Sequence, residues 1–406
     1  MDTNQKVLIE LLSLSLRGKK ASYELMNSAN LEVVLKLAQL HSVLPLVYTA
    51  IDHECIEKKL LADLKTYVYK IVAQQIQNFS VLERVIDEFI NAGIPVLAMK
   101  GLTLRNLYPV PEARTMSDFD LAVRGQDFEY AIQILLKMGF ANVGLSDIVH
   151  VEMAYGKSMI LELHRQLFDE DRIKLPQNYL DELWENAIPV SVCGRNVLGY
   201  SDDDNLLYLC LHLAKHFEEG GFGLRQLCDI VLFVEAKYSS IKWEKFYTKE
   251  RQLHISRFVS VLFALCHLFF NMDIPELFLL ELDIKDEMLE RIILDIVEGG
   301  IFGHSSSVRS TGTRILNRVG FHNLSKFAGL IRFLFPSPDM LCEKYSYIKK
   351  HSVLFPVAWV HRWFYNITDI EQRNMMKVLL KKETAQDSFY ILKSRRELVN
   401  WLKNEE

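Results

Sequence analysis

Residues 94–123 read IPVLAMKGLTLRNLYPVPEARTMSDFDLAV, and this stretch decides the fold. It opens with a short apolar run between a glycine and a lysine-glycine pair, a pattern typical of a buried strand. Its last part, 116–123, predicts a second strand. In that strand Asp118 and Asp120 stand two positions apart, so the alternation of side chains along a strand points both carboxylates to one face.

The sequence around this stretch predicts the rest of an α/β domain. One helix is expected over 102–108, because two prolines follow it, and another over 127–138, because Gly139 follows it. Two more strands are expected over 149–154 and 158–164, joined at a Gly-Lys turn. This βαβαββ order indicates a small domain with a mixed sheet.

On both sides of this domain the sequence predicts helices. Between 60 and 91 apolar residues recur every three or four positions, and the pattern stops at Ala92-Gly93. The segments 206–217 and 224–234 are apolar nearly all round, so they are expected to be buried helices. The fold class is therefore predicted as α+β, mainly helical overall, with a central mixed sheet. The expected division is an N-terminal helical region 1–93, an α/β core 94–200, a helical domain 201–335 and a C-terminal helical segment 336–406.

Composition limits the class of protein. The chain has 406 residues, half of them apolar, and a formal net charge of −5, so it can form more than one core and nucleic acid is not an expected partner. Its six cysteines include no CxxC pair, which argues against a thiolate zinc site and a disulfide framework. No signal-peptide pattern is visible, and the longest apolar run, 258–270, is too short for a membrane span. A cytoplasmic location is expected.

Asp118, Asp120 and Glu162 are the strongest candidates for chemistry. Glu162 stands in an apolar run of the expected strand 158–164, so it can add a third carboxylate from a neighbouring strand. Mg²⁺ prefers oxygen ligands, and two such ions can neutralise phosphate charge and hold a leaving pyrophosphate. A DxD pair alone is common on solvated strands, and so is a single glutamate. An ionised carboxylate inside an apolar run, however, is unfavourable unless it pairs or binds metal, which favours a metal site.

The Lys100-Gly101 pair stands where a phosphate-binding loop is needed. Backbone N–H groups at the start of a helix bind phosphate, and glycine allows a substrate to approach closely. Lys100 and Arg114 are candidates for countering triphosphate charge, since arginine suits bidentate contact with phosphate. Lys100 could instead pair with a structural acid. His164 shares the face of the third carboxylate and could hold it or contact substrate, whereas a single histidine such as His150 is interpreted as structural.

Together these motifs resemble the nucleotidyltransferase superfamily with the DNA polymerase β-like fold. More narrowly, the chain resembles a bacterial branch described as uncharacterised nucleotidyltransferases. That branch has a KG element, a YP-x-P-x-x-R segment, a D-x-D-L-x-V strand and a later E-L-H, found here at 100–101, 108–114, 118–123 and 162–164. The resemblance is most specific over 94–168 and extends more loosely through the helical parts.

The resemblance implies an enzyme of the EC 2.7.7 type that moves an NMP from an NTP to an acceptor hydroxyl, with Mg²⁺ or Mn²⁺ as cofactor. It implies Asp118 and Asp120 as metal ligands, Glu162 as a third ligand that could accept a proton, and Gly101 against the phosphates. The acceptor, a small molecule or a protein, is not specified. The wider superfamily usually has Gly-Ser or Gly-Gly here, whereas Leu102 follows Gly101 in this chain. This departure favours the alternative of a nucleotide-binding or regulatory protein with weak or no turnover.

A second group of polar residues stands on the helices after the sheet domain. His212 and His216 are one turn apart, and so are Arg225 and Asp229. Two histidines and an aspartate can hold a metal, so a metal-dependent phosphohydrolase using His212, His216 and Asp229 is the rival enzyme class. The preferred interpretation is a buried network in which Arg225 pairs with Asp229. Lys215, on the histidine helix, could reach a nucleotide bound between domains.

Overall fold

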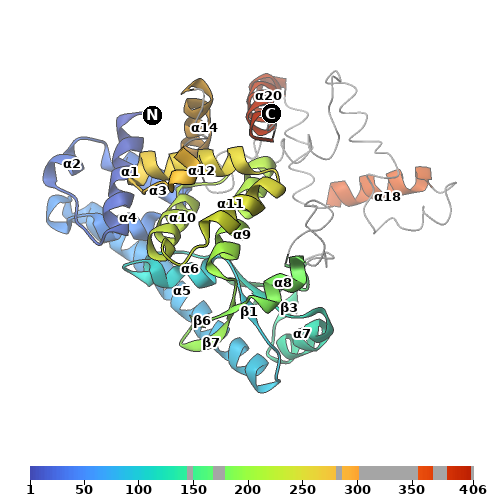
Figure 1. The fold of residues 1–406 in the computed structure, drawn as a ribbon. Helices are drawn as coiled ribbons and strands as arrows, with labels where there is room; N and C mark the ends of the chain where they lie inside the picture. The colour runs from blue at the N-terminus through green and yellow to red at the C-terminus, as the bar shows by residue number, and fades with distance from the viewer. Residues whose placement is uncertain (144–149, 168–178, 280–285, 301–354, 369–381, 404–406) are drawn as a thin grey trace. The chain divides into compact units, whose positions relative to one another are not determined.

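The computed structural model describes residues 1–143, 150–167, 179–279, 286–300, 355–368 and 382–403. They fall into two compact units, whose elements are labelled in Figure 1. The first comprises Met1–Leu213 and Leu224–Leu289, and the second comprises Ala214–Gly223 and Glu290–Asn404. The four-part division expected from the sequence stays a prediction, and its last boundary, at 335/336, lies outside the described residues.

The first unit begins with helices. They are α1 (Thr3–Leu16), α2 (Tyr23–Asn27), α3 (Leu31–Leu40), α4 (Leu44–Ala50), the 3₁₀ turn η1 (His53–Cys55) and α5 (Lys58–Asn91). A capping box starts α1, in which Asp2 accepts a hydrogen bond from the Gln5 N–H and Gln5 accepts one in return. The long α5 confirms the helix predicted over 60–91, and it ends before Gly93, whose φ of 71° suits a helix C-terminus.

A seven-stranded mixed sheet follows α5, with strand order β3-β4-β5-β2-β1-β7-β6. Its strands are β1 (Leu97–Ala98), β2 (Asp118–Ala122), β3 (Ala141–Asn142), β4 (His150–Tyr155), β5 (Met159–His164), β6 (Ile188–Val192) and β7 (Arg195–Gly199). Two neighbouring pairs are parallel, β2 with β5 and β1 with β7, and the other pairs are antiparallel. The predicted α+β fold with a central mixed sheet is confirmed.

The two faces of this sheet have opposite character. One face packs against α5 and α7 (Phe128–Lys137), and it contributes Phe119 and Leu121 of β2, both with no exposed surface, to the main apolar core. The long α5 contacts both α7 and β7 (Figure 1). Since side chains alternate along a strand, the polar residues between these core positions point to the other face. This second face, called the free face here because α5 and α7 pack against the other one, carries Asp118, Asp120 and Glu162.

Several elements differ from the sequence-based expectations. The strand expected over 94–99 forms only at Leu97–Ala98, since Pro95 has no N–H to donate to a ladder. The helix expected over 102–108 is a single turn, α6 (Gly101–Leu104), followed by two 3₁₀ turns, η2 (Arg105–Leu107) and η3 (Pro111–Ala113). Neither β6 nor β7 was predicted, because polar residues interrupt both. They form a hairpin through Cys193 and Gly194, whose φ values of 51° and 72° suit a two-residue turn.

Helices complete both units. The first unit adds η4 (Gly125–Asp127), α8 (Tyr179–Glu185), the start of α9 (Asp202–Glu219), α10 (Leu224–Lys237), α11 (Trp243–Gln252), α12 (Ser256–Phe270) and α13 (Glu276–Leu279). Elements α14 (Asp286–Gly299), α18 (Phe355–Thr368) and α20 (Lys382–Lys403) follow. In the second unit the buried Arg395 pairs with Asp295 and donates to the Phe217 carbonyl at 2.5 Å. Among the described helices, none is both long and apolar enough to cross a bilayer.

Candidate active site

The free face of the sheet carries a row of polar side chains across three adjacent strands. In the parallel pair β2–β5, Asp120 lies opposite Glu162, and in the antiparallel pair β4–β5, Glu162 lies opposite Glu152. Residues opposite each other in a sheet share a face, and so do residues two apart on one strand. The row therefore contains Asp118, Asp120, Glu162, His164, His150 and Glu152.

Asp120 is the buried centre of this row, with an exposed fraction of 2%. The Lys100 ammonium lies 2.5 Å from Asp120 Oδ1 and 3.7 Å from Glu162 Oε2. His164 Nε2 lies 3.1 Å from the same Asp120 oxygen and 3.3 Å from the same Glu162 oxygen. One ligand atom each of Asp120, Glu162 and His164 lies within 4.8 Å of the others, so these three groups could hold one metal ion.

The electrostatics of the cluster favour the ionised form of Glu162. Burial by itself would raise the pKa of Glu162, but the hydrogen bond with His164 and the charge of Lys100 lower that pKa to about 2. Burial would lower the pKa of Lys100, yet Asp120 and the other nearby charges raise it well above its ordinary value. The pKa of His164 is also raised, because its bonds with Asp120 and Glu162 outweigh burial. Each of these three groups therefore lies beside a partner that favours its charged form.

Asp118 stands apart from the closest ligand group. Its side chain is half-buried on β2, and burial together with the charge of Asp120 raises its pKa above the ordinary value. Lys100 opposes that rise without cancelling it. A carboxylate whose ionised form is disfavoured by a like charge is ready to accept a cation. The sequence predicted a close group of Asp118, Asp120 and Glu162, whereas in the structure the close group is Asp120, Glu162 and His164. The metal-binding role of Asp118 stays a prediction.

Comparison with known proteins identifies the family of this chain. The sequence profile of the family described as uncharacterised nucleotidyltransferase matches residues 27–271, more than half of the chain. The chain belongs to this family. Among curated proteins, none matches this nucleotidyltransferase.

Two solved structures resemble this nucleotidyltransferase weakly. One is the antibiotic-resistance factor ANT(2'')-Ia, with 14% identity and a TM-score of 0.34, where the match covers 47% of this chain and 98% of that one. The other is an antigenic nucleotidyltransferase-like protein from Paracoccidioides brasiliensis, with 17% identity and a TM-score of 0.29, covering 43% of this chain and 87% of that one. Scores this low carry no argument about the substrate of this nucleotidyltransferase.

Lys100 of this nucleotidyltransferase has an unusual backbone. Its φ is 50° and its ψ is −125°, a conformation that glycine adopts far more readily than a residue with a side chain. Such strain costs on the order of 1–3 kcal/mol and is concentrated at functional sites. The strained turn between β1 and α6 directs the ammonium to Asp120, which is a candidate metal ligand. Of the two sequence interpretations of Lys100, the structure shows the pairing with an acid, and the contact with triphosphate stays a prediction.

Gly101 has a structural reason to be glycine that the sequence did not suggest, and its predicted place against the phosphates stays a prediction. It is buried, and a Cβ added to it would lie 2.9 Å from Cζ and Nη2 of Arg114. The glycine thus makes room for an internal arginine, whereas the sequence predicted room for a substrate. The helix α6 is also only one turn long, so the helix expected to bind phosphate at its start is shorter than predicted.

Arg114 also differs from its predicted placement. Its exposed fraction is 5%, and Nε and Nη2 donate to the two carboxylate oxygens of Asp229 at 2.9 and 2.7 Å. The Tyr108 hydroxyl donates to the same carboxylate at 2.7 Å. The predicted Arg225–Asp229 pair is replaced by this fork, and Arg225 donates to the Thr115 carbonyl at 2.9 Å. The placement favours a structural role for Arg114 over the predicted contact with triphosphate.

The rival metal site on the helices is not assembled in the described residues. Asp229 is occupied by Arg114, and no close group of metal-ligand atoms in the described part of the chain includes it with His212 or His216. The His212 ring stacks parallel to Tyr208, with 6.2 Å between centroids. This arrangement supports the buried-network interpretation. Lys215 is exposed on α9 within the second unit, and its contact with a nucleotide stays a prediction.

Two further features of the first unit carried no recognisable motif. Tyr208 of α9 lies within electrostatic reach of Lys100 and Asp120, and burial raises its pKa to about 12, so its hydroxyl keeps its proton. Tyr208 stands in an apolar helix, so the sequence alone would predict it as an ordinary residue of the hydrophobic core. Only the packing of α9 near the sheet gives it a place beside the charged row.

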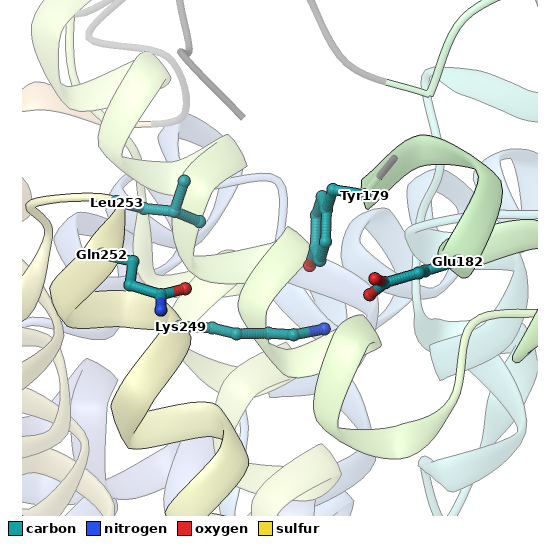
Figure 2. A pocket seen from close by; sticks show the side chains of 5 residues that line it. All are labelled: Tyr179, Glu182, Lys249, Gln252 and Leu253. Atoms are coloured by element: carbon teal, nitrogen blue, oxygen red, sulfur yellow. The ribbon is translucent and has the colours of Figure 1, made fainter. Parts of the chain in front are cut away.

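A cavity of about 150 Å³ lies between α8 and α11. Tyr179, Glu182, Lys249, Gln252 and Leu253 form its lining, and Figure 2 shows the first two facing the others across it. The Lys249 ammonium lies 4.4 Å from the centre of the Tyr179 ring and 2.6 Å from the buried carboxylate of Asp204. Its lining residues are far apart in the chain, so no sequence pattern could have found this cavity.

Proposed function

We propose that this chain transfers a nucleoside monophosphate from an NTP to an acceptor hydroxyl and releases pyrophosphate. The observation that supports it most is the close group of Asp120, Glu162 and His164 on the free face of the sheet. Family membership supports the same class of activity. The donor is proposed as a nucleoside triphosphate, and the acceptor as a small molecule or a protein.

The residues present fit a divalent cation. The row contains the carboxylates of Asp118, Asp120, Glu152 and Glu162, while Lys100 is the cation that contacts it directly. His164 Nδ1 is a buried nitrogen without a hydrogen-bond partner in the described part of the chain, so it has a lone pair or proton to offer a further ligand. We propose Asp118, Asp120 and Glu162 as ligands of two Mg²⁺ or Mn²⁺ ions. Such ions, when bound, supply charge neutralisation to the transferring phosphate.

Lys100, Glu162 and His164 are assigned separate roles in this proposal. Lys100 supplies a fixed positive charge for the triphosphate, since Asp120 already holds its ammonium at the centre of the row. Glu162, with a pKa of about 2, is a weak proton acceptor at neutral pH, so we assign it the role of ligand over that of general base. His164 holds the carboxylates of Asp120 and Glu162 in place through Nε2. Catalysis would come mainly from positioning and charge neutralisation.

The decisive experiment measures pyrophosphate release from each of the four NTPs with Mg²⁺ or Mn²⁺. We expect release by the wild type and a fall of about 10³-fold or more in Asp118→Ala/Asp120→Ala. The matched control is Asp63→Ala/Glu88→Ala, which removes two exposed charges from α5 and should keep full activity. Equal activity in both double variants would sink the mechanism. Nucleotide binding without any release would support a binding or regulatory protein, the alternative suggested by Leu102.

A further inference from the structure

The charged row continues past the proposed catalytic residues onto β4. Glu152 lies directly opposite Glu162, and His150 lies directly opposite His164. The two imidazole rings stack, with centroids 5.0 Å apart and an interplanar angle of 28°. His150 and Glu152 stand two positions apart on one strand, so both side chains share the free face with Glu162.

Glu152 and Glu162 form an unfavourable pair. Like charges directly opposite each other on neighbouring strands destabilise a sheet. Lys100 contacts Glu162 through Oε2, the oxygen that also faces His164. In the described part of the chain, neither the Glu152 carboxylate nor Oε1 of Glu162 takes part in a hydrogen bond or ion pair. A cation between the two glutamates would remove their repulsion.

The geometry suits a metal ion at this position. One ligand atom each of His150, Glu152 and Glu162 lies within 4.8 Å of the others, a second group of this kind beside that of Asp120. Metal–ligand bonds of about 2.0–2.2 Å place two ligand atoms of one ion roughly 3–4 Å apart, so small side-chain rotations close the group. All three side chains are half-buried, so an ion can enter from solvent.

We propose that His150, Glu152 and Glu162 form a second divalent-cation site, outside the Asp118–Asp120 pair. The ligand set also assigns the type of metal. Mg²⁺ favours all-oxygen ligands in a near-ideal octahedron, whereas an imidazole with two carboxylates suits first-row transition metals such as Mn²⁺, Co²⁺ or Zn²⁺. The site does not depend on the proposed transfer reaction. Glu162 belongs to both groups, so an ion bound here also fixes one ligand of the proposed catalytic centre.

The test measures binding of Co²⁺ alone to the full chain, by titration calorimetry and by the visible absorption of the bound ion. Asp118→Asn/Asp120→Asn removes the aspartate pair, and this variant should still bind Co²⁺ more tightly than Mg²⁺. Adding His150→Ala and Glu152→Gln should weaken Co²⁺ binding by about 100-fold or more, since loss of an outer-shell partner alone costs about 10- to 100-fold. The matched control adds His53→Ala and Glu54→Gln, the same residue types from the η1 turn, and should leave Co²⁺ binding unchanged.

A second readout guards against simple misfolding. Glu152→Gln is added alone to the Asp118→Asn/Asp120→Asn variant, which is its parent. Without metal it should melt at the same temperature as this parent or slightly higher, because the substitution removes a repulsion. With Co²⁺ the parent should gain thermal stability and Glu152→Gln should gain much less. The proposal is overturned if the His150/Glu152 substitutions leave Co²⁺ affinity intact, or if the His53/Glu54 control lowers it equally. Failure of pyrophosphate release would leave this result untouched, so the two proposals are tested separately.

Discussion

Two groups of charged residues start only four positions apart in the chain, at Arg114 and Asp118, and differ in how they are paired. In the fork of Arg114 and Asp229, each carboxylate oxygen has a guanidinium donor, and Tyr108 adds a third hydrogen bond. In the row on the sheet, Asp118 and Asp120 share the cation of Lys100 with Glu162. Complete pairing indicates a structural role, whereas excess negative charge indicates a place for a bound cation.

The largest expected effect breaks the fork. Asp229→Asn keeps the shape of the side chain but leaves the buried guanidinium of Arg114 without its counter-charge. Removing one partner of a buried ion pair costs about 3–5 kcal/mol, so the free energy of unfolding should fall by that amount in a urea titration. The exposed Asp63→Asn is the control and should change it little. If the free energy of unfolding falls by less than about 1 kcal/mol, the Arg114–Asp229 pair contributes no more than an exposed ion pair and its structural role is contradicted.

The next effect concerns Gly101, which packs against the guanidinium of Arg114. Gly101→Ala should lower the free energy of unfolding by about 1–3 kcal/mol, because the new methyl group meets a guanidinium that Asp229 holds in place. Gly125→Ala is the matched control, since its nearest neighbour, Arg165 Cγ, is 4.0 Å away. Thermal denaturation of both variants decides the matter. If they melt alike, Arg114 moves freely and the fork is looser than its hydrogen bonds indicate.

A smaller effect tests the strained turn of the charged row. Glycine tolerates the φ of 50° at position 100 and alanine does not, so Lys100→Gly should be more stable than Lys100→Ala by about 1 kcal/mol. Both variants lose the ammonium, so both should lose pyrophosphate release to a similar extent. Equal melting temperatures would show that the turn relaxes once lysine is removed, and full activity in either variant would remove Lys100 from the site.

The smallest effect has the opposite sign. The pKa of Asp118 is raised, so its ionised form destabilises the fold above that pKa, and this penalty is absent below the ordinary aspartate value of 3.8. Asp118→Asn should therefore be as stable as the wild type at acid pH and equally or slightly more stable at neutral pH. Urea titrations across that pH range measure the difference. A variant that is less stable at neutral pH would contradict the raised pKa and show that Asp118 has a stabilising partner.

Local patterns predicted much of the fold and part of the site. Apolar residues at helical spacing predicted α5, and segments apolar nearly all round predicted α9 and α10. Alternation predicted β2, β4 and β5 close to their observed bounds. The shared face of Asp120, Glu162 and His164 also followed from alternation once their strands were placed side by side. Patterns failed where residues of mixed polarity form structure, as in the β6–β7 hairpin, and where Pro95 limits a strand to two residues.

The sequence by itself determined which residues alternate, where helices begin and end, and which acids stand inside apolar runs, since all of these depend on neighbours within a few positions. Tertiary structure alone decided the partners. Arg114 reads as a phosphate ligand until the packing of α10 brings Asp229, 115 positions away, against its guanidinium. Glu152 stands alone in the sequence until β4 pairs with β5 and sets it opposite Glu162, and the same pairing stacks His150 on His164. A charge takes its role from the group that neutralises it, and only the folded chain places that group.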